Sequence, residues 1–225
     1  MKKGFLFFQL IAFICFLSCS EKEKTTYSFL ALGDSYTIGE SVSEGERWPV
    51  QLSKKMSEMG IEIEAPTIIA KTGWTTDELK TGIDNAILDF PYDWVSLMIG
   101  VNNQYRGRPI ENFREEFETL IDLALSFSGN TKQLFVLSIP DWGQMPFAKD
   151  RNQEQISREI DDFNQVIYEI CARKEVVFID ITPLSRLLDT HPDWIASDGL
   201  HPSGQQYAAW VNEILTQLEP VLADE

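Results

Sequence analysis

The sequence contains few of the residues that disulfides and metal sites require. Three cysteines and two histidines occur among its 225 residues. Cys15 and Cys19 lie in the N-terminal segment, so Cys171 alone remains for a folded domain, and we expect no internal disulfide. Cys171 falls in an apolar helical pattern and is expected to be a core thiol. No His, Cys or Asp cluster has the spacing of a metal site, so neither a metal nor another cofactor is expected.

Basic residues are also scarce. The chain has 19 Lys and Arg against 35 Asp and Glu, which gives a formal net charge of −16. A surface of this sign repels polyanions, so a nucleic-acid partner is not expected. The chain also lacks a phosphate-binding glycine loop and a Gly-x-Ser-x-Gly elbow. Its length and its 44% hydrophobic content fit one domain with a full core.

The N-terminus has the pattern of a secretory signal. A basic start precedes the apolar segment 4–17, which is shorter than the roughly 20 residues that a membrane-spanning helix needs. Residues 17–19, Leu-Ser-Cys, resemble the lipobox of bacterial lipoproteins, in which the cysteine is acylated after cleavage. We therefore predict a signal peptide at 1–18, lipid attachment at Cys19 and a tether at 19–26. The predicted location is the bacterial cell envelope, anchored to a membrane, with ordinary secretion as the alternative.

Short apolar runs alternate with amphipathic helical patterns over the remaining residues, 27–225. Strands are expected at 27–32, 67–70, 94–99, 134–139 and 176–179, and helices at 48–60, from 76, and at 111–127, 153–173 and 203–218. Continuously apolar strands that alternate with helices predict a parallel sheet covered on both faces. We expect a three-layer α/β/α sandwich with a five-stranded, flavodoxin-like sheet. In such a sheet, ligands bind at the carboxyl ends of the strands.

A serine stands at the exit of the first predicted strand, in Gly33-Asp34-Ser35. A turn there would place the Ser35 hydroxyl outside the sheet and its amide at the start of a helix. A serine so placed could be a nucleophile, although Gly-Asp-Ser is also an ordinary turn sequence.

The pair Asp198 and His201 could activate such a serine. A carboxylate three residues before an imidazole, with Gly199 between them, can accept the Nδ1 proton and leave Nε2 facing a hydroxyl. Read alone, the pair could also be a helix-capping loop. The other histidine, His191, lacks this spacing and is expected on a surface loop.

Four sequence blocks, each at a strand exit or near the C-terminus, together resemble the SGNH or GDSL hydrolase family. They are Gly33-Asp34-Ser35, Gly73, Gly100-x-Asn102 and Asp198-x-x-His201, and they occur in the family's order. The resemblance covers nearly all of the domain. It implies a catalytic triad of Ser35, Asp198 and His201. It also implies an oxyanion hole made by the Ser35 amide, the Gly73 amide and the Asn102 side chain.

The oxyanion roles also have a physical basis. Gly73 has no side chain to block its N–H, and Asn102 carries two donors on a short side chain. One such donor is worth about 3 to 4 kcal/mol in a transition state. Taken alone, both residues could be no more than turn residues. Asn103 stands where the family often has Asp, and an amide there accepts a hydrogen bond without bringing a charge.

The substrate is less well specified by the sequence. Trp74, Tyr105, Arg106 and Trp142 lie on loops at the same sheet edge and are expected to line a pocket. The resemblance implies a small-molecule ester as substrate. It could be an acyl lipid, as in lysophospholipase-like relatives, or an acetylated sugar, as in the carbohydrate esterases of the family. A lipid-anchored binding protein that does not catalyse a reaction is the third reading.

Overall fold

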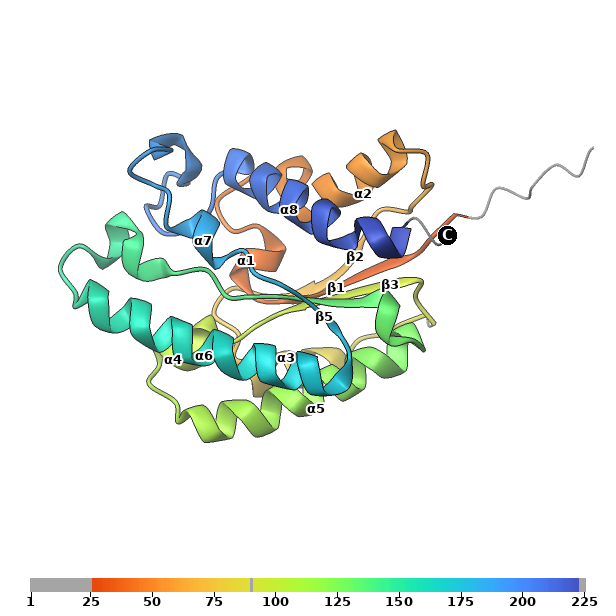
Figure 1. Ribbon diagram of the computed structural model, residues 1–225, viewed down its shortest axis with the longest axis horizontal. Coiled ribbons are helices and arrows are strands. Elements are labelled where there is room, and N and C mark those ends of the chain that lie inside the picture. Colours follow the sequence, from red (N-terminus) through yellow and green to blue (C-terminus); the bar gives the residue numbers. More distant parts are fainter. Residues whose placement is uncertain (1–25, 90, 223–225) are drawn as a thin grey trace, which may run out of the picture.

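The computed structural model describes residues 26–89 and 91–222. They form a three-layer α/β/α sandwich, which confirms the predicted fold class (Figure 1). The predicted signal peptide and the lipid-attachment residue Cys19 lie outside the described residues and stay predictions. Among the helices that are described, none combines the length and the apolar character needed to span a bilayer.

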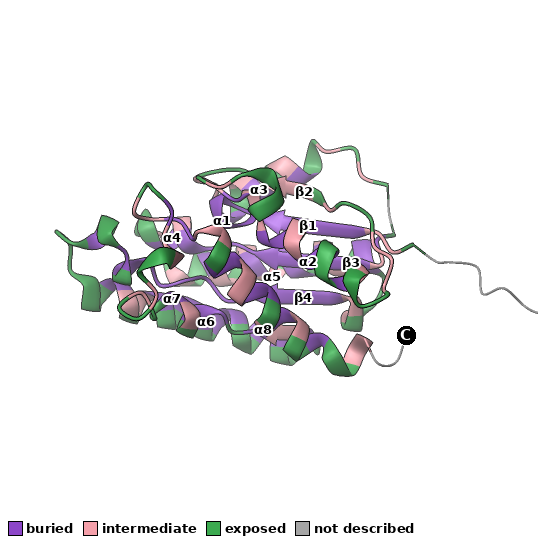
Figure 2. Ribbon diagram, turned by 90° about the horizontal axis from the view of Figure 1, so that it is seen from above, coloured by how far each residue is buried: buried purple, intermediate pink, exposed green. Residues whose placement is uncertain are grey.

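Five parallel strands form the central sheet in the order β2-β1-β3-β4-β5. They are β1 (Phe29–Gly33), β2 (Thr67–Ala70), β3 (Trp94–Met98), β4 (Leu134–Leu137) and β5 (Val177–Ile179). The three central strands are buried along their whole length, whereas the edge strands β2 and β5 are partly exposed (Figure 2). This burial explains why the strands read as unbroken apolar runs.

Helices cover both faces of the sheet (Figure 1). One layer contains α1 (Ser35–Ile38), α2 (Trp48–Glu58), α7 (Thr182–Ser185) and α8 (Gly204–Leu222). The other contains α3 (Thr76–Asp84), α4 (Val101–Tyr105), α5 (Ile110–Ser128) and α6 (Gln153–Lys174). The long predicted helices are present, with ends that differ from the expected ones by a few residues.

Large aromatic side chains connect α2 to the sheet. Trp48, fully buried in the first turn of α2, lies 6.3 Å from the ring of Phe29 on β1 and 6.3 Å from that of Phe135 on β4. The rings of Phe29 and Phe135 are 6.1 Å apart. Burying aromatic rings of this size removes a large apolar area from water, so this cluster holds α2 firmly on the sheet.

A buried amide on α6 holds the chain where it leaves β4. The Oδ1 atom of Asn164 accepts a hydrogen bond from the N–H of Ile139 at 2.8 Å. Its Nδ2 atom donates to the carbonyl of Ile139 and to Oγ1 of Thr182, both at 2.9 Å. The side chain thus replaces the strand pairing that β4 loses after Leu137, and it fixes the start of the following loop.

Replacing Asn164 with Ala should lower the free energy of unfolding by roughly 3 kcal/mol, because the buried N–H of Ile139 loses its partner and the carbonyl of Ile139 keeps only the hydroxyl of Thr182. Urea unfolding followed by circular dichroism measures the change. Gln165→Ala is the control, since Gln165 is exposed and bonds only to Glu169 on the same helix. A midpoint for N164A equal to that of Q165A would contradict this account.

Candidate active site

The register of the sheet brings three loops together. Gly33 at the end of β1 pairs with Ala70 of β2 on one side and with Met98 of β3 on the other. The chain therefore leaves all three strands at the same level. The loops that follow carry Ser35, Gly73 and Asn102, the residues predicted to surround the reacting ester.

The turn after β1 requires a glycine. A Cβ atom on Gly33 would lie 2.1 Å from Oγ1 of Thr37 and 2.6 Å from the carbonyl oxygen of Met98. Both distances are far below van der Waals contact, so only glycine lets α1 fold back this closely onto the strand ends.

Asp34 caps the short helix that begins with Ser35. Its Oδ1 atom accepts the N–H of Tyr36 at 3.0 Å, and its Oδ2 atom lies 3.4 Å from Nδ2 of Asn102. The Asp34 side chain is fully buried, and Ser35 is 5% exposed. Burial raises the pKa of the Asp34 carboxyl from 3.8 to about 7, and the hydrogen bonds from backbone N–H groups offset this only in part.

Asp198 and His201 form the close pair that the sequence predicts. Nδ1 of His201 lies 2.6 Å from Oδ2 of Asp198, and Oδ1 of Asp198 accepts the N–H groups of Leu200 and His201, both at 2.9 Å. Gly199, at φ +71°, makes the tight turn between them.

Burial opposes ionisation of Asp198, but several hydrogen bonds outweigh it. They come from the Ser41 hydroxyl, the His201 ring and the N–H groups of His201 and Leu200, and they hold the pKa of the carboxyl well below its usual range. Asp198 is therefore ionised at neutral pH, and it fixes the imidazole with Nδ1 toward the carboxylate.

Of the predicted oxyanion donors, Asn102 lines one cleft together with Ser35, whereas Gly73 is not among the residues that line it. Gly73 has φ +86°, a conformation that favours glycine, and its carbonyl accepts a hydrogen bond from Arg106 at 2.6 Å. Nδ2 of Asn102 donates to the carbonyl of Trp74 at 2.9 Å, in addition to its longer contact with Asp34. Asn102 thus connects the loops after β1, β2 and β3.

Asn103 joins two of the same loops. Its side chain is fully buried, with Oδ1 accepting the N–H of Thr76 at 3.1 Å and Nδ2 donating to Oγ1 of Thr76 at 2.6 Å. An ionised Asp could accept the same N–H, but it could bond to the hydroxyl of Thr76 only if that hydroxyl gave up its present bond to Glu116. The departure from the family's usual residue therefore leaves this loop well anchored.

A cleft of about 200 Å³ opens between these loops. Ser35, Asn102 and His201 supply its polar groups, and the remaining walls are aromatic or aliphatic. These walls are Tyr36, Val101, Tyr105, Trp142, Phe147 and Leu200. Two of the predicted pocket residues, Tyr105 and Trp142, thus line the cleft.

The other two predicted pocket residues lie elsewhere. The ring of Trp74 packs over Gly82 of α3, so close that a Cβ atom on Gly82 would lie 2.2 Å from the ring. Trp74 borders a separate hollow beside α3. Arg106 binds the Gly73 carbonyl and lies 3.2 Å from the Glu78 carboxylate. Trp74 and Arg106 thus support the loop after β2 and do not line the cleft.

Several cleft residues were not anticipated. Phe147 borders the cleft, and the Arg151 guanidinium lies over the rings of Tyr105, Trp142 and Phe147 at 5.2 to 5.3 Å. Arg151 also donates to the Tyr105 hydroxyl at 3.2 Å. Cation–π contacts of this kind hold the aromatic wall together. The segment 145–151 has no motif in the sequence, and only its nearness to Trp142 could have indicated a role.

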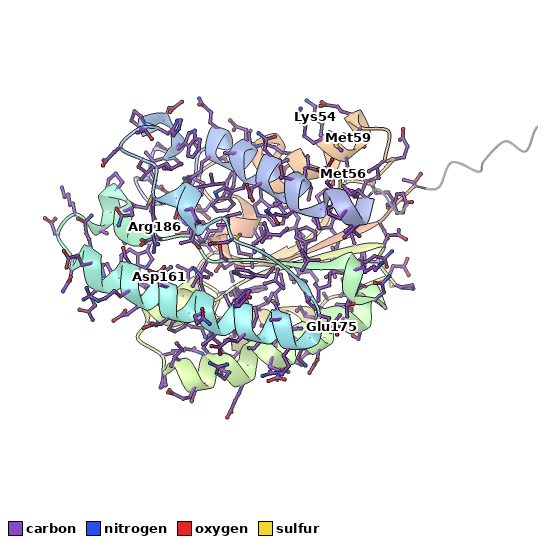
Figure 3. The ribbon with its side chains drawn as sticks, viewed as in Figure 1. Lys54, Met56, Met59, Asp161, Glu175 and Arg186 are labelled. Carbon is purple, nitrogen blue, oxygen red and sulfur yellow. The ribbon has the colours of Figure 1, made fainter. Side chains whose placement is uncertain are left out.

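Ion pairs fix the loop that carries Trp142. The fully buried carboxylate of Asp141 accepts Nε of Arg186 at 2.9 Å, and the same guanidinium reaches Asp161 of α6 at 2.7 Å. Figure 3 labels Arg186 and Asp161, which lie close together between α7 and α6. Because Asp141 is paired, the loop can enter the core without leaving an isolated charge there.

The remaining candidates lie outside the cleft. His191 stacks on Trp194 at 4.1 Å on a surface loop, as expected. Cys171 is fully buried, and burial raises the pKa of its thiol to about 12, which confirms a core thiol. Within residues 26–89 and 91–222, His, Cys, Asp and Glu side chains do not gather in threes that could hold a metal ion.

Comparison with known proteins is consistent with this layout. The sequence profile of the GDSL-like Lipase/Acylhydrolase family matches residues 31–209. An arylesterase from Vibrio mimicus is 22% identical over 211 residues, which is 93% of this chain and 96% of that protein. An acetylxylan esterase from Geobacillus stearothermophilus is 28% identical over 156 residues, covering 65% of this chain and 67% of the relative.

A solved structure shares the fold. The acetylxylan esterase Axe2 from Geobacillus stearothermophilus superposes with a TM-score of 0.67 at 17% identity, over 85% of this chain and 94% of Axe2. The chain belongs to the GDSL-like lipase/acylhydrolase family. It is a carboxylic ester hydrolase.

The raised pKa of Asp34 predicts how stability depends on pH. The folded carboxyl binds its proton more tightly than the unfolded one, so the wild type loses stability as pH rises from about 4 to about 7, by up to roughly 4 kcal/mol. Asp34→Asn keeps a helix cap but does not titrate, so this loss should be absent. Urea titrations at pH 5 and pH 8 measure the free energy of unfolding of both proteins. An equal loss of stability between these pH values in the wild type and in D34N would show that Asp34 is not the cause.

Proposed function

We propose that the protein hydrolyses carboxylic esters with Ser35 as nucleophile, His201 as general base and acid, and Asp198 as the group that orients His201. The observation that carries the proposal is the 2.6 Å contact between Asp198 and Nδ1 of His201, beside a cleft that both His201 and Ser35 line. A carboxylate on Nδ1 leaves Nε2 free to accept a proton from a hydroxyl.

The reaction proceeds in two halves. His201 takes the proton of Ser35 as its Oγ attacks the acyl carbon, and the resulting oxyanion collapses to an acyl-enzyme. The alkoxide leaves with the proton that His201 returns. Water then attacks the acyl carbon, again losing its proton to His201, and the acid leaves as Ser35 recovers its proton.

The donors for the oxyanion are the amides of Ser35 and Gly73 and the side chain of Asn102. The three loops that carry these donors leave the sheet side by side, because Gly33, Ala70 and Met98 are level in it, and this supports the assignment. Asn102 donates to Trp74 at 2.9 Å and makes a 3.4 Å contact with Asp34. The contact with Asp34 is the weaker of the two, so a substrate oxygen could take the place of Asp34 as acceptor for the Nδ2 hydrogen of Asn102.

The cleft favours a short acyl group or a small aromatic alcohol. Its volume of about 200 Å³ is below the roughly 300 to 1,000 Å³ of sites for drug-sized ligands. Aromatic walls suit aryl groups. Two of these aromatic residues, Tyr105 and Phe147, are 45% and 43% exposed, so a sugar could stack on them. The arylesterase and acetylxylan esterase relatives support this choice over a long acyl lipid.

Ser35→Ala should lower kcat by about 10⁶-fold, because the nucleophilic oxygen is removed. Hydrolysis of 4-nitrophenyl acetate measures the change. Ser43→Ala, on the loop after α1, is the matched control and should retain activity, since Ser43 bonds only Glu46. Near-full activity of S35A would overturn the assignment of the nucleophile.

The short cleft predicts a preference for short chains. Across 4-nitrophenyl esters from acetate to palmitate, kcat/KM should be greatest for acetate or butyrate and fall with length. Phe147→Ala should shift the optimum to longer chains, because it removes one wall. Tyr168→Ala removes an aromatic of similar exposure on α6 that does not line the cleft, and it should leave the profile unchanged. An optimum at palmitate in the wild type would favour the lysophospholipase-like reading.

A further inference from the structure

Ser41, on the loop after α1, contacts the proposed triad directly. Its hydroxyl donates to Oδ2 of Asp198 at 2.6 Å, and the same oxygen lies 2.6 Å from Nδ1 of His201. Oδ1 of Asp198 is already bonded to two backbone N–H groups. With Ser41 in place, each carboxylate oxygen has two donors, and rotation of the carboxylate would break several bonds at once.

The backbone of Ser41 is held in a conformation that serine rarely adopts. Its φ is +66°, in the left-handed region. In the described part of the chain, Glu175 at φ +57° is the one other non-glycine residue with positive φ, and it ends α6 as a C-cap. Ser41 has no such role, because Gly39 already ends α1. The strained conformation has a different consequence, which is to aim the hydroxyl at Asp198.

Glu40, which precedes Ser41, connects the same loop to the loop after β2. The N–H of Glu40 donates to the carbonyl of Ser35 at 3.0 Å. The Glu40 carboxylate accepts the hydroxyl of Thr72, which precedes Gly73. Glu40 and Ser41 therefore link three segments: the turn that carries Ser35, the loop after β2, and the turn that carries Asp198 and His201.

We propose that Ser41 is a positioning residue, which holds the Asp198 carboxylate in the orientation that fixes the His201 ring. This inference rests on the proposed function. The side chain of Asp198 is 31% exposed, so without Ser41 water would reach Oδ2 and compete with His201. The Ser41 hydroxyl takes the place of that water and supplies one donor with a fixed direction.

Ser41→Gly tests the proposal without straining the fold. Glycine adopts φ +66° readily, so the loop should keep its path and the melting temperature should not fall. We expect kcat to fall about 10- to 100-fold with KM unchanged, because only the orientation of Asp198 and His201 is affected. Ser43→Ala is again the matched control, since Ser43 also donates to a carboxylate at 2.6 Å but does not touch Asp198.

Two further readouts separate positioning from a merely structural role. The proton on Nδ1 of His201 should give a far-downfield NMR resonance, absent in His201→Ala, that moves in S41G and stays in place in S43A. Ser41→Asn tolerates the left-handed conformation and restores a donor, so it should recover part of kcat.

The outcomes also separate this proposal from the proposed function. Wild-type kcat and an unmoved resonance in S41G, alongside an inactive S35A, would overturn the role of Ser41 alone. Activity retained in S35A, or no ester hydrolysis by the wild type, would overturn the proposed function itself.

Discussion

Parallel pairing of β1 with both β2 and β3 is the constraint on which the whole site depends. Because Gly33, Ala70 and Met98 share one level of the sheet, three loops emerge side by side. Asn102 then bridges all three through its contacts with Asp34 and Trp74. A shift of one residue in either pairing would turn the strand's side chains to the opposite face and separate these groups.

Two aspartates at this edge have opposite electrostatic surroundings. Asp34 is fully buried with few donors, and its pKa is raised to about 7. Asp198 receives hydrogen bonds from Ser41, His201 and the backbone, and its pKa is lowered. Two residues of the same type are thus suited to two tasks: the Asp34 carboxyl caps the turn that carries Ser35, and the Asp198 carboxyl remains charged beside the imidazole.

Much of the fold and part of the site could be predicted from the sequence. Strands buried on both faces leave unbroken apolar runs, and the spacing of Asp198 and His201 itself implies their contact, because Gly199 permits the tight turn. Cleft walls made by segments distant in sequence leave no local pattern. Trp74 was misplaced because its ring direction depends on the space over Gly82, which only the tertiary structure reveals.

The role of Ser41, on the loop after α1, could not be predicted for a related reason. A serine in a polar, glycine-containing segment is ordinary, and neither the positive φ of Ser41 nor its bond to Asp198 can be read from local sequence. The same holds for Arg151, whose stacking over three rings depends on the path of residues 145–151 before α6 begins. Geometry of this kind is decided by packing between elements.

The most direct test of the account is covalent labelling of the protein with a fluorophosphonate, followed by peptide mass spectrometry. A serine activated by His201 and Asp198 should carry the adduct at Ser35, stoichiometrically in the wild type and far more slowly in His201→Ala. A protein that remains unlabelled at Ser35, or that is labelled equally well without the imidazole, would contradict the account.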